Sequence, residues 1–174
     1  ADQLELHVDA ETFLRLAARD VILNAAREVL GQAIHARYLA DQQGIKPPDD
    51  PSMQPWNSLD KGLRESNRQQ ADHIATKLRA VGYGILPVHD RVPCPVTFTD
   101  DEVEMMAAME HDRWMTERRL DGWVYAKDRD VDHKMSSCLV PYAELPENVK
   151  KWDRQFVRAI SQILALANHE AHRL

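Results

Sequence analysis

The chain has 174 residues, of which 44% are apolar and 29% are charged, a composition typical of a folded, soluble domain. Its formal net charge of −6 argues against a protein that binds nucleic-acid polymers, because contacts with phosphates need a basic surface. No apolar run is long enough to span a membrane, the first residues show no signal-peptide pattern, and only Cys94 and Cys138 are cysteines, so we expect a reduced, cytoplasmic setting.

A long helix is predicted at the start of the chain. Asp9 is placed to cap it, and the apolar period continues to about Gln42, where Gly44 ends the helix. Because this is longer than most helices, a break near Arg19 and Asp20, or at Gly31, is an alternative. The helix begins with an apolar stripe of Phe13, Leu14, Leu16, Ala17, Val21 and Leu23.

A proline-rich segment and a second helix follow. Residues 45–55 contain four prolines and predict an extended crossing loop. The next helix is expected over about 59–81, with residues 82–84 (Gly-Tyr-Gly) ending it. Ser66 and Gln69 have the spacing of a capping box, so this helix is expected to begin or kink there.

The central helix carries the clearest functional signal. After a linker at 85–95, Thr99 and Glu102 form a capping box that predicts a helix over 100–121, ended by Gly122. Its apolar stripe continues into polar, charged and aromatic residues, namely Glu110, His111, Trp114, Met115, Glu117 and Arg118. Such groups in positions where the period requires core are typical of a binding site.

Two further elements are predicted after the central helix. A short strand at 122–125 is expected to pair with the region around 138–140, with 127–137 as the loop between them. Pro146 suits a first helical position, so the last helix should run from there to about Asn168. Its apolar face is interpreted as core: Val149, Trp152, Phe156, Ile160, Ile163 and Leu164.

The first and second halves of the chain resemble each other in sequence. Residues 33–44 can be laid on 109–122, which places His35 on His111, Arg37 on Arg113 and Tyr38 on Trp114. Residues 59–78 lie on 145–164 without a gap, pairing Leu59 with Leu145, Leu63 with Val149, Arg68 with Arg154, Ile74 with Ile160, and Leu78 with Leu164. Shared apolar periodicity explains part of the match, but the ordered His-x-Arg-aromatic correspondence favours duplication.

The fold predicted from this similarity is mainly α. Two helix–loop–helix units, each with a short strand in its loop, would pack about a pseudo-twofold axis with equivalent helices facing one another. The first unit is 1–90 and the second is 91–174. A groove between the two units is the natural place for a pocket, because concave sites favour interfaces.

Five short motifs occur in order in the second unit: VPCPV (92–96), EHDRW (110–114), GWVY (122–125), LVPY (139–142) and ELPE (144–147). In this order they resemble the ryanodine-receptor (RyR) repeat, a module found in tandem in calcium-release channels and in bacterial and phage proteins. The first unit looks like the divergent partner repeat of the bacterial forms, through its IHARY, WNSL and ESNRQQADHIATKL segments. The resemblance covers about 91–168.

The resemblance implies a mainly helical tandem-repeat fold without established catalytic activity. In bacterial relatives the module looks like an accessory sensor, often joined to nucleotide-binding or potassium-transport regulatory domains. In the channel family, paired repeats imply a cleft that accepts an adenine nucleotide against tryptophans. This chain departs from the family pattern at Ala126, where Gly is usual, and at Met135, Ser136 and Ser137, where a His-Pro is usual.

Candidate ligand-binding residues come from both units. They are His111, Arg113, Trp114, Arg118, Trp123, Tyr125 and Lys134 in the second unit, and His35, Tyr38, Asn67 and Arg68 in the first. Indole rings stack on bases for roughly 1–3 kcal/mol, and guanidinium groups bind phosphate or carboxylate bidentately. Tyr125 is expected on the same side of its strand as Trp123.

Each candidate also has an ordinary structural interpretation. The tryptophans suit a small core, Arg113 is close enough to Glu110 and Glu117 for local ion pairs, and Arg68 has the spacing to pair with Asp72. The histidines suit buried bonds to backbone carbonyls. The loop at 127–134 carries charges of both signs and is either a solvated loop or a flap over an anion; its DRDVD sequence is a weak calcium motif. Trp56 is interpreted as an anchor of the first loop.

The leading hypothesis is a non-enzymatic ligand-sensing module that binds a nucleotide-like or other small anionic ligand between the repeats, without a cofactor. The alternative is a protein-interaction or scaffold module of a larger bacterial protein, such as a potassium-transport regulator. A third hypothesis is an enzyme that uses His111 with Glu110 or Glu117 as acid and base. The sequence does not support it, because it contains no nucleophile elbow, phosphate-binding glycine loop or metal cluster. We further expect the chain to be a fragment that works with other domains of a longer parent protein.

Overall fold

The computed structural model describes residues 10–174, with side chains described from residue 26 onward. Its helices are α1 (Ala10–Gln42), α2 (Lys61–Asp72), α3 (Ile74–Ala80), α4 (Asp100–Leu120) and α5 (Glu147–Leu166), with 3₁₀ turns at Pro51–Met53 and Tyr142–Glu144. Its short strands are β1 (Tyr83–Pro87), β2 (Val124–Tyr125), β3 (Met135–Ser136) and β4 (His169–Arg173). The mainly helical fold is therefore confirmed. None of the helices described has the length and apolarity that crossing a bilayer requires.

Helix α1 runs without interruption and ends at Gln42, as predicted. Gly44 adopts a left-handed conformation (φ +78°), which a glycine tolerates without strain. Neither alternative break occurs. Gly31 instead permits close packing, because a Cβ atom there would approach Cη2 of Trp56 to 3.3 Å. The stripe expected at Phe13 and its neighbours lies outside the residues whose side chains are described.

The second predicted helix is divided differently from the prediction. It begins at Lys61, where the Asp60 carboxylate accepts a hydrogen bond from the backbone N–H of Gly62. The prediction of a start or kink at Ser66 is wrong, since the backbone breaks at His73, between α2 and α3. The preceding proline-rich loop also contains a short 3₁₀ turn rather than extended chain alone.

Helix α4 follows its capping prediction. The Thr99 hydroxyl accepts a hydrogen bond from the Glu102 N–H (3.3 Å), and the Glu102 carboxylate accepts one from the Thr99 N–H (2.8 Å). The helix ends at Leu120, and Gly122 is left-handed (φ +83°). Helix α5 begins at Glu147, so Pro146 is its N-cap rather than its first helical residue.

The interpretation of residues 82–95 as a helix stop and linker is wrong in part. Tyr83–Pro87 form strand β1, which pairs antiparallel with β4 at His169–Arg173, directly after α5. The last helix therefore ends two residues before the predicted Asn168. The offset that lays Leu59 on Leu145 also lays Ile85 on Ala171, and these two residues are register partners at the centre of the ladder. The pairing thus joins two segments that are related by the same alignment offset.

The prediction placed the partner of the short strand at 122–125 too late in the sequence. Val124 and Tyr125 pair with Met135 and Ser136 in parallel, not with the region around 138–140. Lys134 takes a left-handed conformation (φ +52°), and an antiparallel bridge joins Asp130 to Met135. The chain therefore turns back between Asp130 and Met135, and this turn places β3 parallel to β2.

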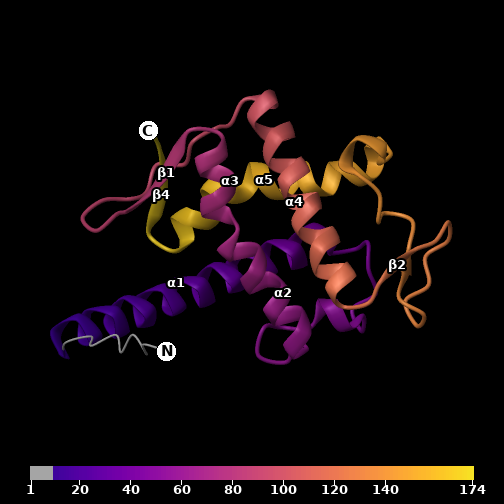
Figure 1. Cartoon of the computed structure of the whole chain (residues 1–174), viewed down its shortest axis with the longest axis horizontal. Coiled ribbons are helices and arrows are strands. Elements are labelled where there is room, and N and C mark those ends of the chain that lie inside the picture. Colours follow the sequence, from indigo (N-terminus) through magenta and orange to yellow (C-terminus); the bar gives the residue numbers. More distant parts are fainter. Residues whose placement is uncertain (1–9) are drawn as a thin grey trace, which may run out of the picture.

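Helices from both units share one core. Figure 1 shows α1 lying beside α2, and α4 crossing α5. Buried side chains of α3, α4 and α5 form the centre of this core: Ile74, Leu78, Val103, Met106, Ala107, Val157, Ile160, Ile163 and Leu164. A smaller cluster contains Met115, Trp123 and Leu139. The prediction that Trp152 is core is wrong, since its side chain remains 47% exposed.

Candidate functional site

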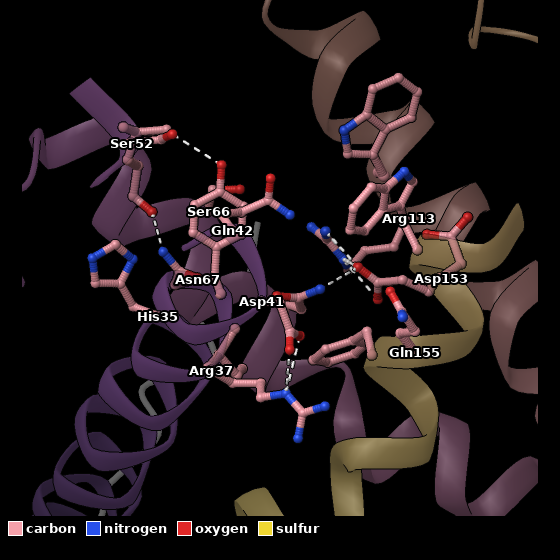
Figure 2. A pocket seen from close by; sticks show the side chains of 18 of the residues that line it. His35, Arg37, Asp41, Gln42, Ser52, Ser66, Asn67, Arg113, Asp153 and Gln155 are labelled. Atoms are coloured by element: carbon pink, nitrogen blue, oxygen red, sulfur yellow. Dashed lines mark hydrogen bonds and ion pairs between the residues drawn. The ribbon is translucent and has the colours of Figure 1, made fainter. Parts of the chain in front are cut away.

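A cleft of about 650 Å³ lies between the two units. One wall is formed by α1, the loop after it and α2, and the other by α4, α5 and the loop after α4. Figure 2 shows side chains from both walls, with His35, Ser52 and Asn67 on one side and Arg113, Asp153 and Gln155 on the other. The lining mixes apolar, aromatic and charged groups, which suits a small amphipathic ligand.

Eight of the predicted site residues line this cleft. They are His35, Tyr38 and Asn67 in the first unit, and His111, Arg113, Trp114, Arg118 and Trp123 in the second. Residues that are distant in the sequence therefore converge as the internal similarity predicts. The remaining three, Arg68, Tyr125 and Lys134, lie outside the cleft.

Each of these three has another neighbour. Nε of Arg68 donates to a Glu28 carboxylate oxygen at 2.7 Å, so the alternative pairing with Asp72 is also wrong. Tyr125 is 60% exposed although Trp123 is buried, so the two do not share an environment as expected. Lys134 donates to the backbone oxygen (2.7 Å) and a carboxylate oxygen (3.0 Å) of Asp121.

The two histidines occupy matching places. Both are buried, and Nε2 of each donates to a backbone carbonyl: His35 to Gln54 at 2.7 Å, and His111 to Val140 at 2.8 Å. His35 stacks on Tyr38, with ring centroids 6.2 Å apart, and His111 stacks on Trp114 at 5.5 Å. The structural interpretation of both histidines is therefore confirmed.

A carboxylate distinguishes His111. Nδ1 of His111 lies 3.6 Å from Oδ2 of Asp153 on α5. Burial lowers the pKa of His111, but Asp153 and the Val140 carbonyl outweigh that effect and raise it above its ordinary value. Burial in turn raises the pKa of Asp153, an effect that His111 partly offsets.

The matching contacts extend around the histidines. Arg68 and Trp56 both donate to Glu28 in the first unit, at 2.7 and 2.9 Å. In the second unit, Arg154 and the Tyr142 hydroxyl donate to Glu104. Each glutamate lies on the same helix as its histidine, seven positions before it. Trp56 is thus an anchor of its loop, as predicted.

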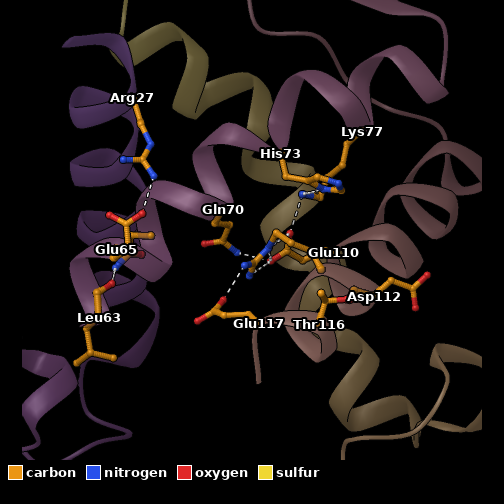
Figure 3. A network of polar contacts seen from close by, with 12 residues as sticks. Arg27, Leu63, Glu65, Gln70, His73, Lys77, Glu110, Asp112, Thr116 and Glu117 are labelled. Carbon is orange, nitrogen blue, oxygen red and sulfur yellow. Dashed lines mark hydrogen bonds and ion pairs between the residues drawn. The ribbon is translucent and has the colours of Figure 1, made fainter. Parts of the chain in front are cut away.

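A buried ionic network crosses from the first unit to the second (Figure 3). Nζ of Lys77, which is fully buried on α3, lies 2.7 Å from a carboxylate oxygen of Glu110. Gln70 of α2 donates to the same carboxylate at 2.8 Å. Arg113 completes the network by contacting both Glu110 (2.8 Å) and Glu117 (2.7 Å). Arg113 is therefore held by protein carboxylates, as its structural interpretation predicts.

The network shifts the titration of its members. Burial lowers the pKa of Lys77, and Glu110 only partly offsets this. Burial alone would raise the pKa of Glu110, but Lys77 and Arg113 outweigh it and keep the pKa below its ordinary value. His73, which lies 3.1 Å from Nζ of Lys77, has its pKa lowered by burial and by that positive charge.

Two guanidinium groups meet at one indole ring. Arg118 lies 5.2 Å and Arg129 5.7 Å from the centroid of Trp123, and Arg118 also lies 5.9 Å from Trp114. The Trp123 indole donates to the Asp121 carboxylate at 3.0 Å, which fixes its orientation. Within the part of the chain that the structure describes, neither arginine has a carboxylate within ion-pair distance. Both line the cleft.

Comparison with known protein families supports the resemblance found in the motifs. Residues 97–172 match the family model of the RyR domain. This part of the chain belongs to the RyR domain family. The RyR domain begins just before α4 and ends within β4, so it supplies the whole second wall of the cleft.

Several cleft residues were missed by sequence analysis. In the RyR domain these include Trp152, and in the first unit Lys46 and Ser52. Arg129 also lines the cleft, and the sequence had placed it in the loop that was interpreted either as solvated or as a flap over an anion. Trp152 was assigned to core because it follows the apolar period of α5. Arg129 belongs to a loop of mixed charge, whose path no local pattern defines. Among the described residues, no cluster of three or more potential metal ligands occurs.

Proposed function

We propose that the chain is a cytoplasmic, non-enzymatic ligand-sensing module that binds a small anionic, nucleotide-like compound between its two units. The observation that carries this proposal is the pair Arg118 and Arg129. Both guanidinium groups line the cleft and rest on the Trp123 ring. In a protein of net charge −6, an anion needs such a local cationic cluster.

The other charged groups of the cleft support this assignment. Arg113 is paired with Glu110 and Glu117, and Arg37 with Asp41. Lys46 contacts Asp50 at 3.4 Å. An incoming anion would therefore compete with a carboxylate at these three positions, whereas at Arg118 and Arg129 it would meet guanidinium groups that retain their hydrogen-bonding capacity.

We further propose that the two units are copies of one helix–loop–helix repeat related by a pseudo-twofold axis, with the boundary near residue 90. The matching contacts of His35 and His111, and the pairing of β1 with β4 at equivalent residues, support this arrangement. A ligand between such copies touches both, so its binding would stabilise one relative placement of the units. This coupling is what a sensor needs.

A non-catalytic role is supported by the bonding of the acid–base candidates. His111 donates to the Val140 carbonyl, and Glu110 is shared between Lys77 and Arg113. The contacts of both groups are with other protein groups that join helices and loops. We therefore place them in the framework of the cleft.

Thermal unfolding of the full chain tests the proposal. The compounds to add are the four nucleoside triphosphates, adenosine diphosphate ribose and inorganic triphosphate. At a concentration of 100 times Kd, binding stabilises the fold by about 2.7 kcal/mol, which is a shift of several degrees in Tm. Arg118→Gln and Arg129→Gln should abolish the shift.

Arg119→Gln is the matched control. Arg119 is the exposed neighbour of Arg118 on α4 and does not line the cleft, so its loss changes the net charge equally without touching the site. A control variant that loses the shift as fully as Arg118→Gln would reduce the effect to general electrostatics. Absence of a shift with every compound in the wild-type protein would reject ligand sensing.

A scaffold role is the second candidate, and an exposed apolar segment favours it. Leu120, Val124, Tyr125 and Val131 are each more than half exposed around the end of α4 and strand β2. Such a segment offers an apolar contact to another domain or protein. This role predicts no stabilisation by small compounds, and it separates from ligand sensing in the same thermal measurement.

A further inference from the structure

The buried network that joins the two units includes a histidine at the break between two helices. His73 ends α2 and precedes α3, and its side chain makes no capping bond to α3. Nδ1 of its ring lies 3.1 Å from Nζ of Lys77, one turn further along the chain. Figure 3 shows both side chains next to Glu110 of α4. The contact between the units therefore contains a group that titrates near neutral pH.

The chemistry of Lys77 decides the direction of this hydrogen bond. Its side chain is fully buried, and Nζ lies 2.7 Å from a carboxylate oxygen of Glu110. An ammonium group has donors and no acceptor, so its second contact needs a lone pair on Nδ1 of His73. The neutral ring with its proton on Nε2 supplies that lone pair. A protonated ring has donors on both nitrogens, and the bond from Lys77 is then lost.

The charges around His73 also oppose a proton on its ring. Lys77 faces the ring from α3, and Glu110 and Arg113 face it from α4. Burial lowers the pKa of His73 most, the positive charge of Lys77 adds to this effect, and Glu110 only partly offsets it. Asp153 of α5 acts on the neighbouring ammonium, since its negative charge favours the charged form of Lys77. A proton on His73 would therefore add a positive charge beside a buried one.

We propose that His73 is a pH-sensitive joint between the two units. The neutral ring accepts a hydrogen bond from Lys77 and thereby holds α3 against Glu110 of α4. Protonation removes this bond, adds a repelling charge at the break between α2 and α3, and loosens the contact between the units. The ring is only partly buried, so a proton from solvent reaches it. Because Glu110 also lines the cleft, a change at the joint reaches the cleft wall without contact with a ligand.

The direction of the pH dependence follows from the lowered pKa. A histidine with a lower pKa in the folded state binds its proton more readily in the unfolded chain. The contribution of His73 to stability is therefore complete above its ordinary pKa of about 6.5 and is lost as the pH falls through the folded value. His111, whose pKa is raised, changes stability in the opposite direction, so a comparison of variants is needed to isolate His73.

Urea unfolding of the full chain at pH 8 and pH 5 compares the wild type with His73→Gln. The glutamine carbonyl accepts a hydrogen bond from Lys77 but does not titrate. On acidification, the unfolding equilibrium constant of the wild type should rise severalfold more than that of the variant. His89→Gln is the matched control, because His89 is exposed in the loop after β1 and, among the described residues, takes no part in the network of Lys77 and Glu110. It should follow the wild type.

Hydrogen exchange shows where the structure loosens. After correction for the intrinsic effect of pH on exchange, the amides of α3 should lose protection between pH 8 and pH 5 in the wild type. His73→Gln should keep most of this protection. Equal loss of protection in the two proteins, or equal destabilisation by acid in the urea measurement, would overturn the inference.

The titration of the ring itself gives a result that a purely structural role would not produce. Nuclear magnetic resonance follows it, and the signal of His73 is identified by its absence from His73→Gln. The midpoint should lie below about 6.5 and move upward in Lys77→Met, because the neighbouring positive charge is removed. A wild-type midpoint at or above that value would contradict the proposal, even if Lys77→Met does not fold. None of these measurements uses a ligand, so their failure leaves ligand sensing intact.

Discussion

The two walls of the cleft are built on the same framework but present different surfaces. On the first wall, polar groups are bonded within the wall itself: the Tyr38 hydroxyl to Ser52, Lys46 to Ser52, and Asn67 to the Leu63 carbonyl. On the second wall, Arg118 and Arg129 contact indole rings only, among the groups described.

This difference indicates a division of labour. Each histidine is fixed in the same way, by a carbonyl from the loop that follows its helix. The two loops differ, because the β2–β3 pairing folds back the loop after α4. Arg129 of this loop then lies over the Trp123 ring. The two walls thus share similar histidine contacts but differ in their polar groups. Those of the first wall are hydrogen-bonded within the wall, whereas Arg118 and Arg129 of the second wall contact indole rings, and this second wall belongs to the RyR domain.

The largest effect is expected where the two walls are tied together, at Glu110. Replacing this buried carboxylate by alanine leaves the charges of Lys77 and Arg113 without their main partner. Breaking a buried ion pair in this way costs about 3–5 kcal/mol in the free energy of unfolding. Urea unfolding followed by circular dichroism measures this loss.

The control variant changes a carboxylate at the periphery of the same network. Glu117 is partly exposed, and among the described residues its carboxylate is paired with Arg113 alone, so Glu117→Gln should cost about 1 kcal/mol or less. The double variant Lys77→Met/Glu110→Leu removes both charges and should recover part of the loss. A cost below about 1 kcal/mol for Glu110→Ala would show that the units are not joined through this network.

A smaller effect, with a defined pH dependence, is expected at His111. Because its pKa is raised in the folded state, its contribution to stability is complete below its ordinary pKa of about 6.5 and is lost as the pH rises through the folded value. The loss caused by His111→Gln, measured by urea unfolding, should therefore be larger at pH 5.5 than at pH 9.

His35 sharpens this comparison between the walls. It makes the equivalent carbonyl bond, but within the described residues no carboxylate lies within ion-pair distance of its ring. His35→Gln is accordingly the matched variant for His111→Gln. Equal pH dependence in the two variants would show that Asp153 does not set the behaviour of His111.

The sequence predicted the framework better than the surface. The capping box of α4, the polar groups on its core-facing rows and the correspondence of His35 with His111 are local or periodic signals, and each appears in the structure. The ion pair of Lys77 was not predicted, because its partner Glu110 lies on another helix. Side-chain pairing between helices produces no periodic pattern in the sequence.

The surface was predicted less completely, for other physical reasons. Trp152 follows the apolar period of α5, but the period does not reveal that the helix enters the core only after this residue. Arg129 depends on a loop whose path is set by the β2–β3 pairing. Strand β4 has the sequence HEAHR, without the β-branched or aromatic residues that indicate a strand, and it forms only because β1 lies beside it.

The smallest effects test whether the two frameworks are copies. Arg68 ties α2 to Glu28 of α1, and Arg154 ties α5 to Glu104 of α4. These partly exposed pairs contribute about 1 kcal/mol or less each, so Arg68→Ala and Arg154→Ala should lower the free energy of unfolding by similar small amounts. Salt should weaken both contributions in parallel. A loss several times larger for one variant, measured by urea unfolding, would mean that the tie has become essential in only one unit, and the duplication would then survive in geometry but not in energetics.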